Sequence, residues 1–354
     1  MFDVEAGAGA KVSSTTINEE LGQVTYVFSD KTGTLTQNIM EFRSLLCGFE
    51  NYGETGNPGI TRKLSLIEKR KEVETNFKSR KLDRVLRDGI GGTDNPLIIT
   101  SRNGRTKLKL KSETQKVQEL IKLLSICHDC EAEEANVNGV HIKFYQGASP
   151  DEITLVDFAR DQGFEFDEAD NKTINITLNP ESGIVKKSEK REYIIHQKTA
   201  FTSTRARMSL LFTDPDDGKI KLFIKGADSK IKALLDPEQK DLEIMENLED
   251  FLDKASAQGL RTLLMACRVI DPEEFDQIQD DLREAENDVN NAKERIAQIV
   301  NEYEQGVVLL GATVVEDKLQ DNVPQTLEDF RRAGIKVWML TGDKLETAKN
   351  IGFS

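Results

Sequence analysis

The chain has 354 residues, of which 38% are hydrophobic and 31% charged, and this length allows two or three domains with cores of their own. Its formal net charge of −14 argues against nonspecific binding to nucleic acid. The 4 cysteines have no disulfide spacing, and no apolar run reaches the roughly 20 residues of a membrane-spanning helix, so we expect a reducing, cytosolic setting.

The first predicted strand, at residues 24–28, is a short buried run that leads into the string DKTGTLT at 30–36. Asp30 is therefore expected at the carboxyl end of a strand, where open α/β sheets bind ligands. The Lys31 ammonium, hydroxyls and backbone N–H groups follow it and can surround a phosphoryl group. An isolated Asp after a strand is usually a turn residue. A carboxylate is also a competent nucleophile toward phosphorus, and this string is far more specific than a turn.

Residues 53–116 differ in composition from the rest of the chain, because Gly, Asn and basic residues dominate them. This composition predicts a flexible, partly disordered or loosely helical insertion. A solvated surface segment is the favoured interpretation, and contact of its basic residues with anionic lipid headgroups or an acidic partner is the alternative.

The middle of the chain predicts an antiparallel sheet with helices. A helix is expected over 117–130, and another begins after Ser149, with Pro150 at its first position and Glu152 completing a capping box. Alternating apolar residues then predict strands, and periodic runs predict helices. The strands are expected at 192–197, 207–212, 219–225 and 261–270, and the helices at 242–258 and within 272–304. The CHDC string at 127–130 lacks the second ligand pair of a structural zinc site, so zinc is disfavoured.

The last part of the chain alternates strand, helix, strand and helix, which is typical of a parallel α/β domain. A strand is expected at 306–317 and another at 335–340, where it delivers Thr341, Gly342 and Asp343 to the start of a helix. Helix N-termini bind anions through free N–H groups, so this turn is a second candidate for phosphate binding. A plain strand–turn–helix capped by Thr341 or Asp343 is the alternative.

Three strings, DKTGTLT at 30–36, KGAD at 225–228 and TGDKLETAKNIG at 341–352, resemble the signatures of P-type ATPases. The resemblance implies a mixed fold, α/β plus α+β. A discontinuous, haloacid-dehalogenase-like phosphorylation domain with a parallel sheet would comprise 1–44 and 306–354. An inserted nucleotide-binding domain of antiparallel sheet flanked by helices would comprise 45–305.

The same resemblance implies the phosphate chemistry. Asp30 would accept the γ-phosphate of ATP, with Lys31 and Thr32 beside it in the catalytic string. Asp30 and Thr32 would hold Mg²⁺, and Thr341, Gly342 and Asp343 would bind the phosphate. Soluble phosphatases of this superfold carry a second Asp where Thr32 stands. Since Thr32 cannot transfer a proton as a carboxylate does, the phosphoenzyme is expected to persist.

Longer strings, at 17–38, 145–156, 201–212 and 309–352, resemble the phospholipid-flippase branch of that family. The branch implies an adenosine pocket made by Glu152, Phe201, Ser203, Met208, Lys225, Ala227 and Arg261. An aromatic face suits the base, and the planar fork of Arg261 suits phosphate or ribose oxygens. Without the resemblance, a core Phe201, a purely capping Glu152 and solvated charges at Lys225 and Arg261 would be favoured.

The family also implies parts that these residues do not contain: membrane helices, a DGET-type loop and a GDGxND string that ligates Mg²⁺. We therefore expect a monomeric fragment at the cytoplasmic face of a membrane that binds ATP but phosphorylates itself poorly. Phospholipid and an accessory subunit would act through the missing parts. The alternatives are a noncatalytic ATP-binding or interaction module, a soluble phosphatase, and a fragment of a cation-transporting P-type ATPase.

Overall fold

A computed structural model of the chain describes residues 2–3, 8–9, 20–53, 77, 79–89, 96–137, 140–239, 242–288 and 291–342. The chain divides into two units. The smaller comprises Met1–Asn38 and Lys318–Lys344, and the larger comprises Ile39–Asp317 and Leu345–Ser354. Within the described ranges, every helix is too short or too polar to span a lipid bilayer.

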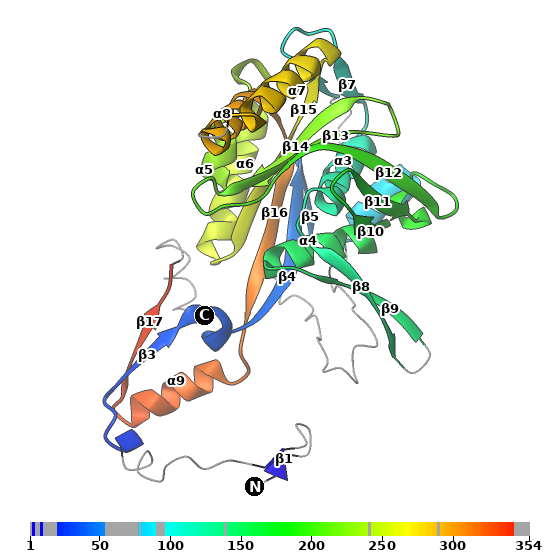
Figure 1. The fold of residues 1–354 in the computed structure, drawn as a ribbon. Helices are drawn as coiled ribbons and strands as arrows, with labels where there is room; N and C mark the ends of the chain where they lie inside the picture. The colour runs from blue at the N-terminus through cyan, green and yellow to red at the C-terminus, as the bar shows by residue number, and fades with distance from the viewer. Residues whose placement is uncertain are drawn as a thin grey trace. The chain divides into compact units, whose positions relative to one another are not determined.

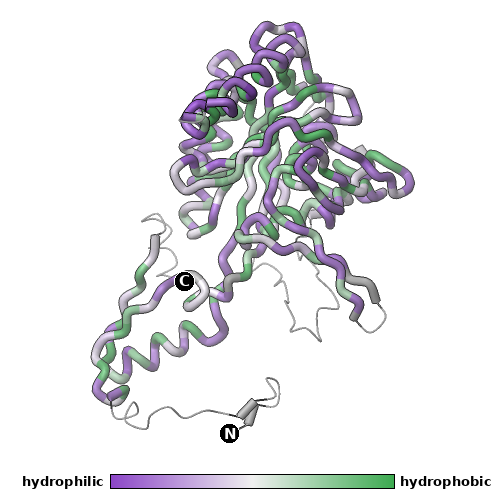
Figure 2. The backbone as a smooth tube through the Cα atoms, in the orientation of Figure 1, coloured by the Kyte–Doolittle hydropathy of each residue, from purple (hydrophilic) through white to green (hydrophobic). Residues whose placement is uncertain are grey.

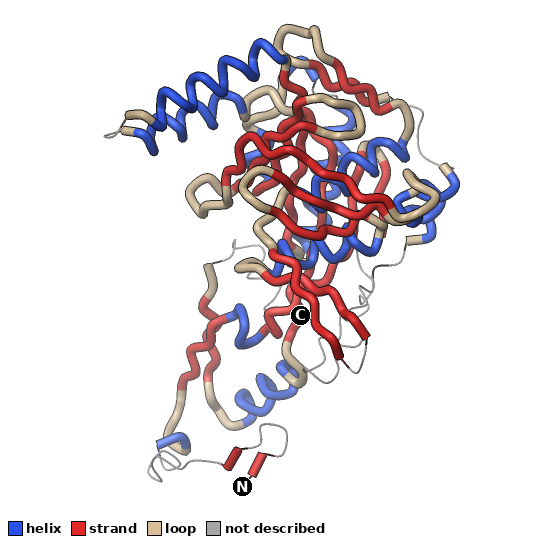
Figure 3. Tube along the Cα trace, turned by 45° about the vertical axis from the view of Figure 1, so that its right-hand side comes forward, coloured by secondary structure: helices blue, strands red, loops and turns tan. Residues whose placement is uncertain are grey.

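The larger unit is built on a nine-stranded sheet with the order β10-β11-β12-β13-β14-β15-β16-β4-β5 (Figures 1 and 3). Its strands are β10 (Phe164–Ala169), β11 (Thr173–Leu178), β12 (Glu189–Thr199), β13 (Arg207–Thr213), β14 (Ile220–Gly226), β15 (Arg261–Ile270), β16 (Val308–Leu319), β4 (Thr36–Cys47) and β5 (Glu50–Gly53). Neighbouring strands from β10 to β16 pair antiparallel, and so do β4 and β5. The antiparallel sheet predicted for the middle of the chain is confirmed.

Helices cover both faces of this sheet (Figure 1). One layer contains α3 (Glu113–Ile126) and α4 (Pro150–Asp161), and the other contains α5 (Asp228–Lys232), α6 (Leu242–Ala257), α7 (Pro272–Glu286) and α8 (Ala292–Tyr303). Side chains alternate between the layers along β14: Phe223 packs in the cluster with α3 and α4, whereas Leu222 and Ile224 pack with α6, α7 and α8. Figure 2 shows abundant hydrophilic residues along α7 and α8, as expected for surface helices.

Shorter elements complete the larger unit. They are the hairpin β8 (Glu131–Val137) and β9 (Val140–Gln146), the pair β6 (Leu97–Thr100) and β7 (Lys107–Leu110), and the single turns α2 (Arg80–Asp83), η3 (Arg84–Asp88), η4 (Pro180–Ser182) and η5 (Pro237–Gln239). Of the segment 53–116 predicted as a flexible insertion, residues 54–76, 78 and 90–95 lie outside the described residues. The described remainder holds α2, η3, β6, β7 and the start of α3.

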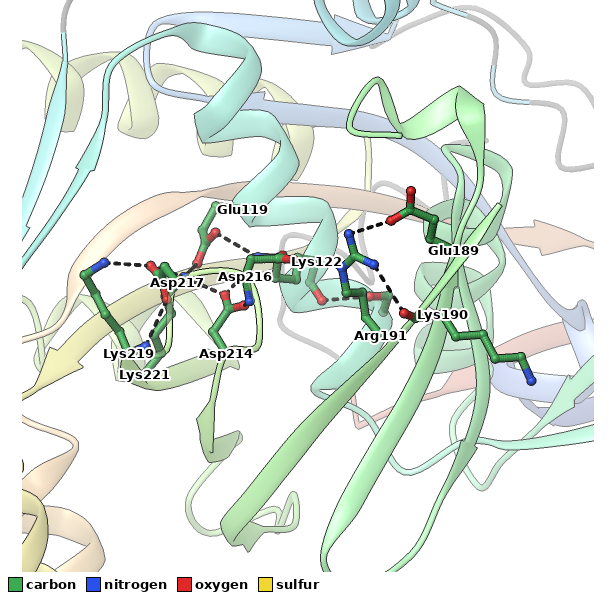
Figure 4. A network of polar contacts seen from close by, with 11 residues as sticks. Glu119, Lys122, Glu189, Lys190, Arg191, Asp214, Asp216, Asp217, Lys219 and Lys221 are labelled. Carbon is green, nitrogen blue, oxygen red and sulfur yellow. Dashed lines mark hydrogen bonds and ion pairs between the residues drawn. The ribbon is translucent and has the colours of Figure 1, made fainter. Parts of the chain in front are cut away.

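A buried network of charges ties α3 to the hairpin of β13 and β14 (Figure 4). The Asp214 carboxylate, 0% exposed, lies 2.9 Å from Lys122 Nζ and 2.7 Å from Lys221 Nζ. Glu119 Oε1 lies 2.9 Å from Lys221 Nζ and Glu119 Oε2 lies 3.5 Å from Lys122 Nζ, so each ammonium has more than one carboxylate partner. Burial alone would raise the pKa of Asp214, but the two lysines lower it to about 2.

The smaller unit contains β3 (Tyr26–Asp30), the turn η1 (Lys31–Leu35), α9 (Val323–Arg332) and β17 (Lys336–Leu340). The very short strands β1 (Phe2–Asp3) and β2 (Ala8–Gly9) pair with each other. The prediction of a buried first strand is wrong, because Tyr26 is 50% and Phe28 65% exposed. Among the described residues, β3 pairs with β17 alone, and two strands leave the outward face of the sheet uncovered.

The strand predicted at 306–317 belongs to a different sheet from the one expected. It forms β16, which pairs antiparallel with β15, for example Arg261 with Val315, instead of joining a parallel sheet. The reason is that a central strand buried on both faces has an unbroken apolar run, and such a run is equally typical of a parallel strand. The units meet in sequence at 38/39 and 317/318, and the domain boundaries expected at 44/45 and 305/306 stay predictions.

Candidate functional site

Glu152 and Lys225 form a buried ion pair between two elements of the larger unit. Lys225 lies near the end of β14 and is 3% exposed, and Glu152 lies in the first turn of α4. Lys225 Nζ is 2.9 Å from Glu152 Oε1, and Glu152 Oε2 accepts the backbone N–H of Asp129 at 3.1 Å. The Lys225 ammonium has three donors, and Glu152 is its ion-pair partner among the described residues. The ammonium group of Lys225 therefore keeps N–H donors that can bind an acceptor atom of a ligand.

The two partners stabilise each other's charged forms. Burial would lower the pKa of Lys225, but the Glu152 carboxylate raises it above its usual value. Burial would likewise raise the pKa of Glu152, and Lys225 and the Asp129 N–H lower it instead. Both groups are therefore ionised at neutral pH, which suits recognition of a polar, charged ligand.

The capping box predicted at the start of α4 does not form. Ser149 is the N-cap residue but makes no side-chain capping bond. The Glu152 carboxylate, which would accept the Ser149 N–H in a capping box, is instead engaged with Lys225 and the Asp129 N–H. Pro150 does occupy the first turn, as predicted. The interpretation of Glu152 as a purely capping residue, and of Lys225 as a solvated charge, is therefore wrong.

The predicted pocket residues of the 201–208 segment differ in exposure. Phe201 is 55% exposed in the turn after β12, so it is not a core residue. Ser203 is exposed in the same turn. Met208 pairs with Lys225 across β13 and β14, but its side chain is 1% exposed and packs in the core. Ala227, the N-cap residue of α5, donates its N–H to the Ala206 carbonyl at 2.9 Å.

Arg261, at the start of β15, is held by two carboxylates. Its Nη1 lies 3.0 Å from Asp151 Oδ2, and its Nη2 lies 3.4 Å from Asp317 Oδ2. Asp151 precedes Glu152 in the first turn of α4, so this ion pair attaches Arg261 to the element that carries the Glu152 carboxylate. Its side chain is 29% exposed, so part of the guanidinium faces solvent.

A cavity of about 670 Å³ lies beside the ion pair. Its lining includes Asp129, Phe166, Asp170, His196 and Lys198, and Asp129 connects it with Glu152 through the backbone N–H. None of the seven predicted adenosine-pocket residues lines it. Sequence reasoning missed Asp129 and Lys198, whose side chains pair at 2.7 Å. The CHDC string that carries Asp129 was the available signal, but its interpretation as a metal motif does not single out Asp129.

His128 fixes the turn that presents the Asp129 N–H to Glu152. Its Nε2 lies 2.9 Å from the Ser125 carbonyl, and its Nδ1 accepts the Cys130 N–H at 3.1 Å. The Nε2–H tautomer satisfies both contacts. Burial, with a further effect from Lys225, lowers the pKa of His128 to about 3, so the buried ring is neutral. Burial raises the pKa of Cys127 and Cys130 to about 12, so these thiols are protonated.

This neutral histidine predicts loss of stability in mild acid. Between the unfolded pKa of 6.5 and the folded value of about 3, the unfolded chain binds one more proton, so the free energy of unfolding falls by about 1.4 kcal/mol per pH unit of acidification. Since Asn can replace the Nδ1 acceptor without titrating, His128→Asn is expected to lose about 2 kcal/mol less than the parent chain between about pH 7 and pH 5. Urea unfolding at both pH values measures this difference. Parallel losses in the two proteins would contradict it.

In the smaller unit, Asp30 and Thr341 lie at the same edge of a parallel strand pair. Asp30 pairs with Leu340 in the register of β3 and β17, so residue 341 follows directly beside it. The Asp30 carboxylate is exposed and accepts the Lys31 N–H at 2.7 Å, and Lys31 itself is buried. A Cβ added at Gly342 would meet no atom of the described residues within 4 Å. Asp343 and the side chain of Thr32 lie outside the described residues.

Comparison with known proteins identifies relatives of both units. Residues 116–322 match a family model described as P-type ATPase, cytoplasmic domain N. The chain is 36% identical over 357 residues to the phospholipid-transporting ATPase ID of Mus musculus, and the match covers 100% of this chain and 27% of that protein. It is 37% identical over 350 residues to the phospholipid-transporting ATPase DRS2 of Saccharomyces cerevisiae, covering 97% of this chain and 23% of that protein. The chain thus spans about a quarter of the length of these relatives.

Proposed function

Because this chain belongs to the P-type ATPases, whose cytoplasmic domain N matches residues 116–322, we propose that it binds ATP and is phosphorylated on Asp30 as part of a phospholipid-transporting ATPase. The observation that carries this proposal is the similarity of the whole chain, at 36% identity, to proteins named phospholipid-transporting ATPases. The chain would act at the cytoplasmic face of a membrane.

The larger unit would hold the nucleotide. Phe201 offers an exposed aromatic face to the base, and Lys225 and Glu152 provide a preorganised pair of opposite charges. Arg261 would contact phosphate or ribose oxygens with the exposed part of its guanidinium. Ser203 and Ala227 would line the pocket through polar or backbone contacts, and Met208 would support it from the core.

The smaller unit would carry out phosphoryl transfer. A carboxylate oxygen of Asp30 attacks the γ-phosphorus of ATP, the bond to the β–γ bridging oxygen breaks, and ADP leaves with that electron pair. Lys31 supplies a nearby positive charge, and Thr341, Gly342 and Asp343 would bind the phosphate oxygens. Asp30 and Thr32 would hold Mg²⁺, which neutralises charge on the phosphate oxygens. Thr32 supplies no carboxylate for hydrolysis, so the phosphoenzyme would persist long enough to drive a conformational change.

A chimera tests this function. The chain replaces the matching segment of the Mus musculus relative, and membranes containing the chimera are incubated with γ-labelled ATP and Mg²⁺. We expect an acid-stable, hydroxylamine-sensitive label that Asp30→Asn abolishes, with ATP binding unchanged, because the substitution removes only the nucleophile. Asp329→Asn, at an exposed carboxylate on α9, is the matched control and retains the label.

The chimera also separates the alternatives. ATP binding without any label would favour the noncatalytic module, and turnover of a simple phosphate monoester by the chain alone would favour the phosphatase. Transport of a labelled phospholipid by the chimera, lost in Asp30→Asn, would show that this chain can drive the relative's lipid-transporting part, which supports the flippase assignment. A chimera that is labelled but transports no phospholipid would favour a fragment of a cation pump.

A further inference from the structure

A buried carboxylate at the end of α8 holds the strand that leaves the Phe201 turn. Glu304 is 0% exposed and is the C-cap residue of α8. One oxygen, Oε1, accepts Arg205 Nη2–H and, at 2.5 Å, the Ser209 hydroxyl. The other, Oε2, accepts Arg207 Nε–H at 2.8 Å. Both oxygens of Glu304 are thus bound to donors from one short stretch of chain.

The position of Glu304 is unfavourable unless these donors are present. A carboxylate at a helix C-terminus faces the negative end of the helix dipole, and burial removes the water that would otherwise solvate it. The two guanidinium groups compensate for both effects. The contacts that neutralise Glu304 therefore also hold Arg205 and Arg207 in place.

Ala206, between the two arginines, has a constrained backbone. Its φ of 49° lies in the left-handed region, which is uncommon for a residue with a Cβ and persists where surrounding contacts enforce it. Its N–H donates to the Thr202 carbonyl at 2.7 Å, which closes the turn after Phe201, and its carbonyl accepts the Ala227 N–H. A Cβ at Gly226 would lie 2.5 Å from that same carbonyl. The turn therefore sits tightly against the residues that follow Lys225.

We propose that Glu304 is a positioning residue for the nucleotide, which acts by holding Arg205 and Arg207 so that the turn carrying Phe201 stays docked beside Lys225. This inference rests on the proposed function, in which Phe201 contacts the base. Glu304 itself touches no ligand in this proposal: its carboxylate determines where the aromatic ring stands.

A double-mutant cycle on the 354-residue chain, with ATP binding followed by calorimetry, tests the proposal. Phe201→Ala is expected to weaken ATP binding about tenfold, as loss of one stacking partner does. Glu304→Gln removes the charge that holds both arginines and is expected to weaken binding to a similar extent. The double variant should be about tenfold weaker than the parent chain instead of about a hundredfold, because both changes remove the same contact. Glu302→Gln, an exposed glutamate of α8, is the matched control and retains the parent affinity.

Thermal unfolding of the same variants separates positioning from general stability. The decrease in Tm from Glu304→Gln should be the same with and without Phe201, whereas the affinity loss should disappear without Phe201. Unchanged ATP affinity in Glu304→Gln, or additive losses of affinity in the double variant, overturns the inference. A loss of affinity in Phe201→Ala would still support the nucleotide site in that case. If Phe201→Ala leaves ATP affinity unchanged, the premise that Phe201 contacts the base is wrong, and the inference fails with it. If Glu304→Gln does not fold, Arg205→Gln, which leaves Arg207 on the carboxylate, replaces it in the cycle.

Discussion

Lys225→Met is expected to weaken ATP binding by the larger unit about a hundredfold, because it removes the buried ammonium that would contact the nucleotide, and truncating one partner of a desolvated charge contact across a binding interface costs at least about 2 kcal/mol. Methionine retains much of the side chain's volume, so packing between β13 and β15 is preserved while the ammonium is lost. The remaining Glu152 carboxylate would then repel ATP phosphates that Lys225 attracts. Calorimetric titration of the chain with ATP measures the change.

Lys219→Met is the matched control for this substitution. Lys219 lies in the turn at the other end of the same hairpin and pairs with Asp217 at 3.0 Å, with its side chain 30% exposed. Its loss is expected to leave ATP affinity unchanged. Equal affinities for Lys225→Met and the parent chain would show that the ion pair with Glu152 is structural and that the nucleotide binds elsewhere.

Asp214→Asn is expected to lower the free energy of unfolding by about 3 kcal/mol at neutral pH, because it takes from the buried ammonium groups of Lys122 and Lys221 one of the two carboxylates that they share. The value lies at the lower end for a broken buried pair, since Glu119 still contacts both lysines. The folded pKa of Asp214 is about 2, so its contribution is fully present above its unfolded pKa of about 3.9. It is lost as pH falls through the folded value.

Urea unfolding of Asp214→Asn and of Asp217→Asn compares the loss of a buried carboxylate with the loss of a more exposed one. Asp217 belongs to the same network but is 25% exposed, and an exposed pair contributes at most about 1 kcal/mol. The difference between the free energies of unfolding of the two variants should narrow below about pH 4, where the stabilising contribution of Asp214 begins to fall. Equal effects at neutral pH would mean that burial of the Asp214 carboxylate adds nothing to stability.

Local sequence patterns predicted the positions of helices and strands better than they predicted which strands pair. The alternating residues of β13 and β14, and the helix that begins at Pro150, were found because period and capping residues are local signals. The pairing of β16 was not, because an apolar run buried between two helix layers does not specify the direction of its neighbours. The exposure of β3 was missed for a related reason: burial depends on covering layers that a strand's own residues do not reveal.

In the candidate site, too, local sequence patterns did not reveal the contacts between distant segments. Glu152 and Lys225 were predicted through family resemblance, since their own surroundings favoured a capping residue and a solvated lysine. The roles of Glu304 and Asp214 had no local signal. Each depends on contacts between segments far apart in the chain, such as Glu304 with Arg207 or Lys122 with Asp214. The assignments of Asp30 and of Thr341, Gly342 and Asp343 as phosphate-handling residues stay predictions.

Helix α3 is attached to strand β14 at two separated points, through Lys221 near the start of the strand and through the turn after Ile126 that reaches Glu152 and Lys225. A ligand arriving at Lys225 would meet a surface that folding has already organised. Little conformational entropy would then be lost on association, so the rate of capture should depend mainly on diffusion and charge and only slightly on ordering of the chain. Adjustment to different ligands would be confined to the exposed side chain of Phe201.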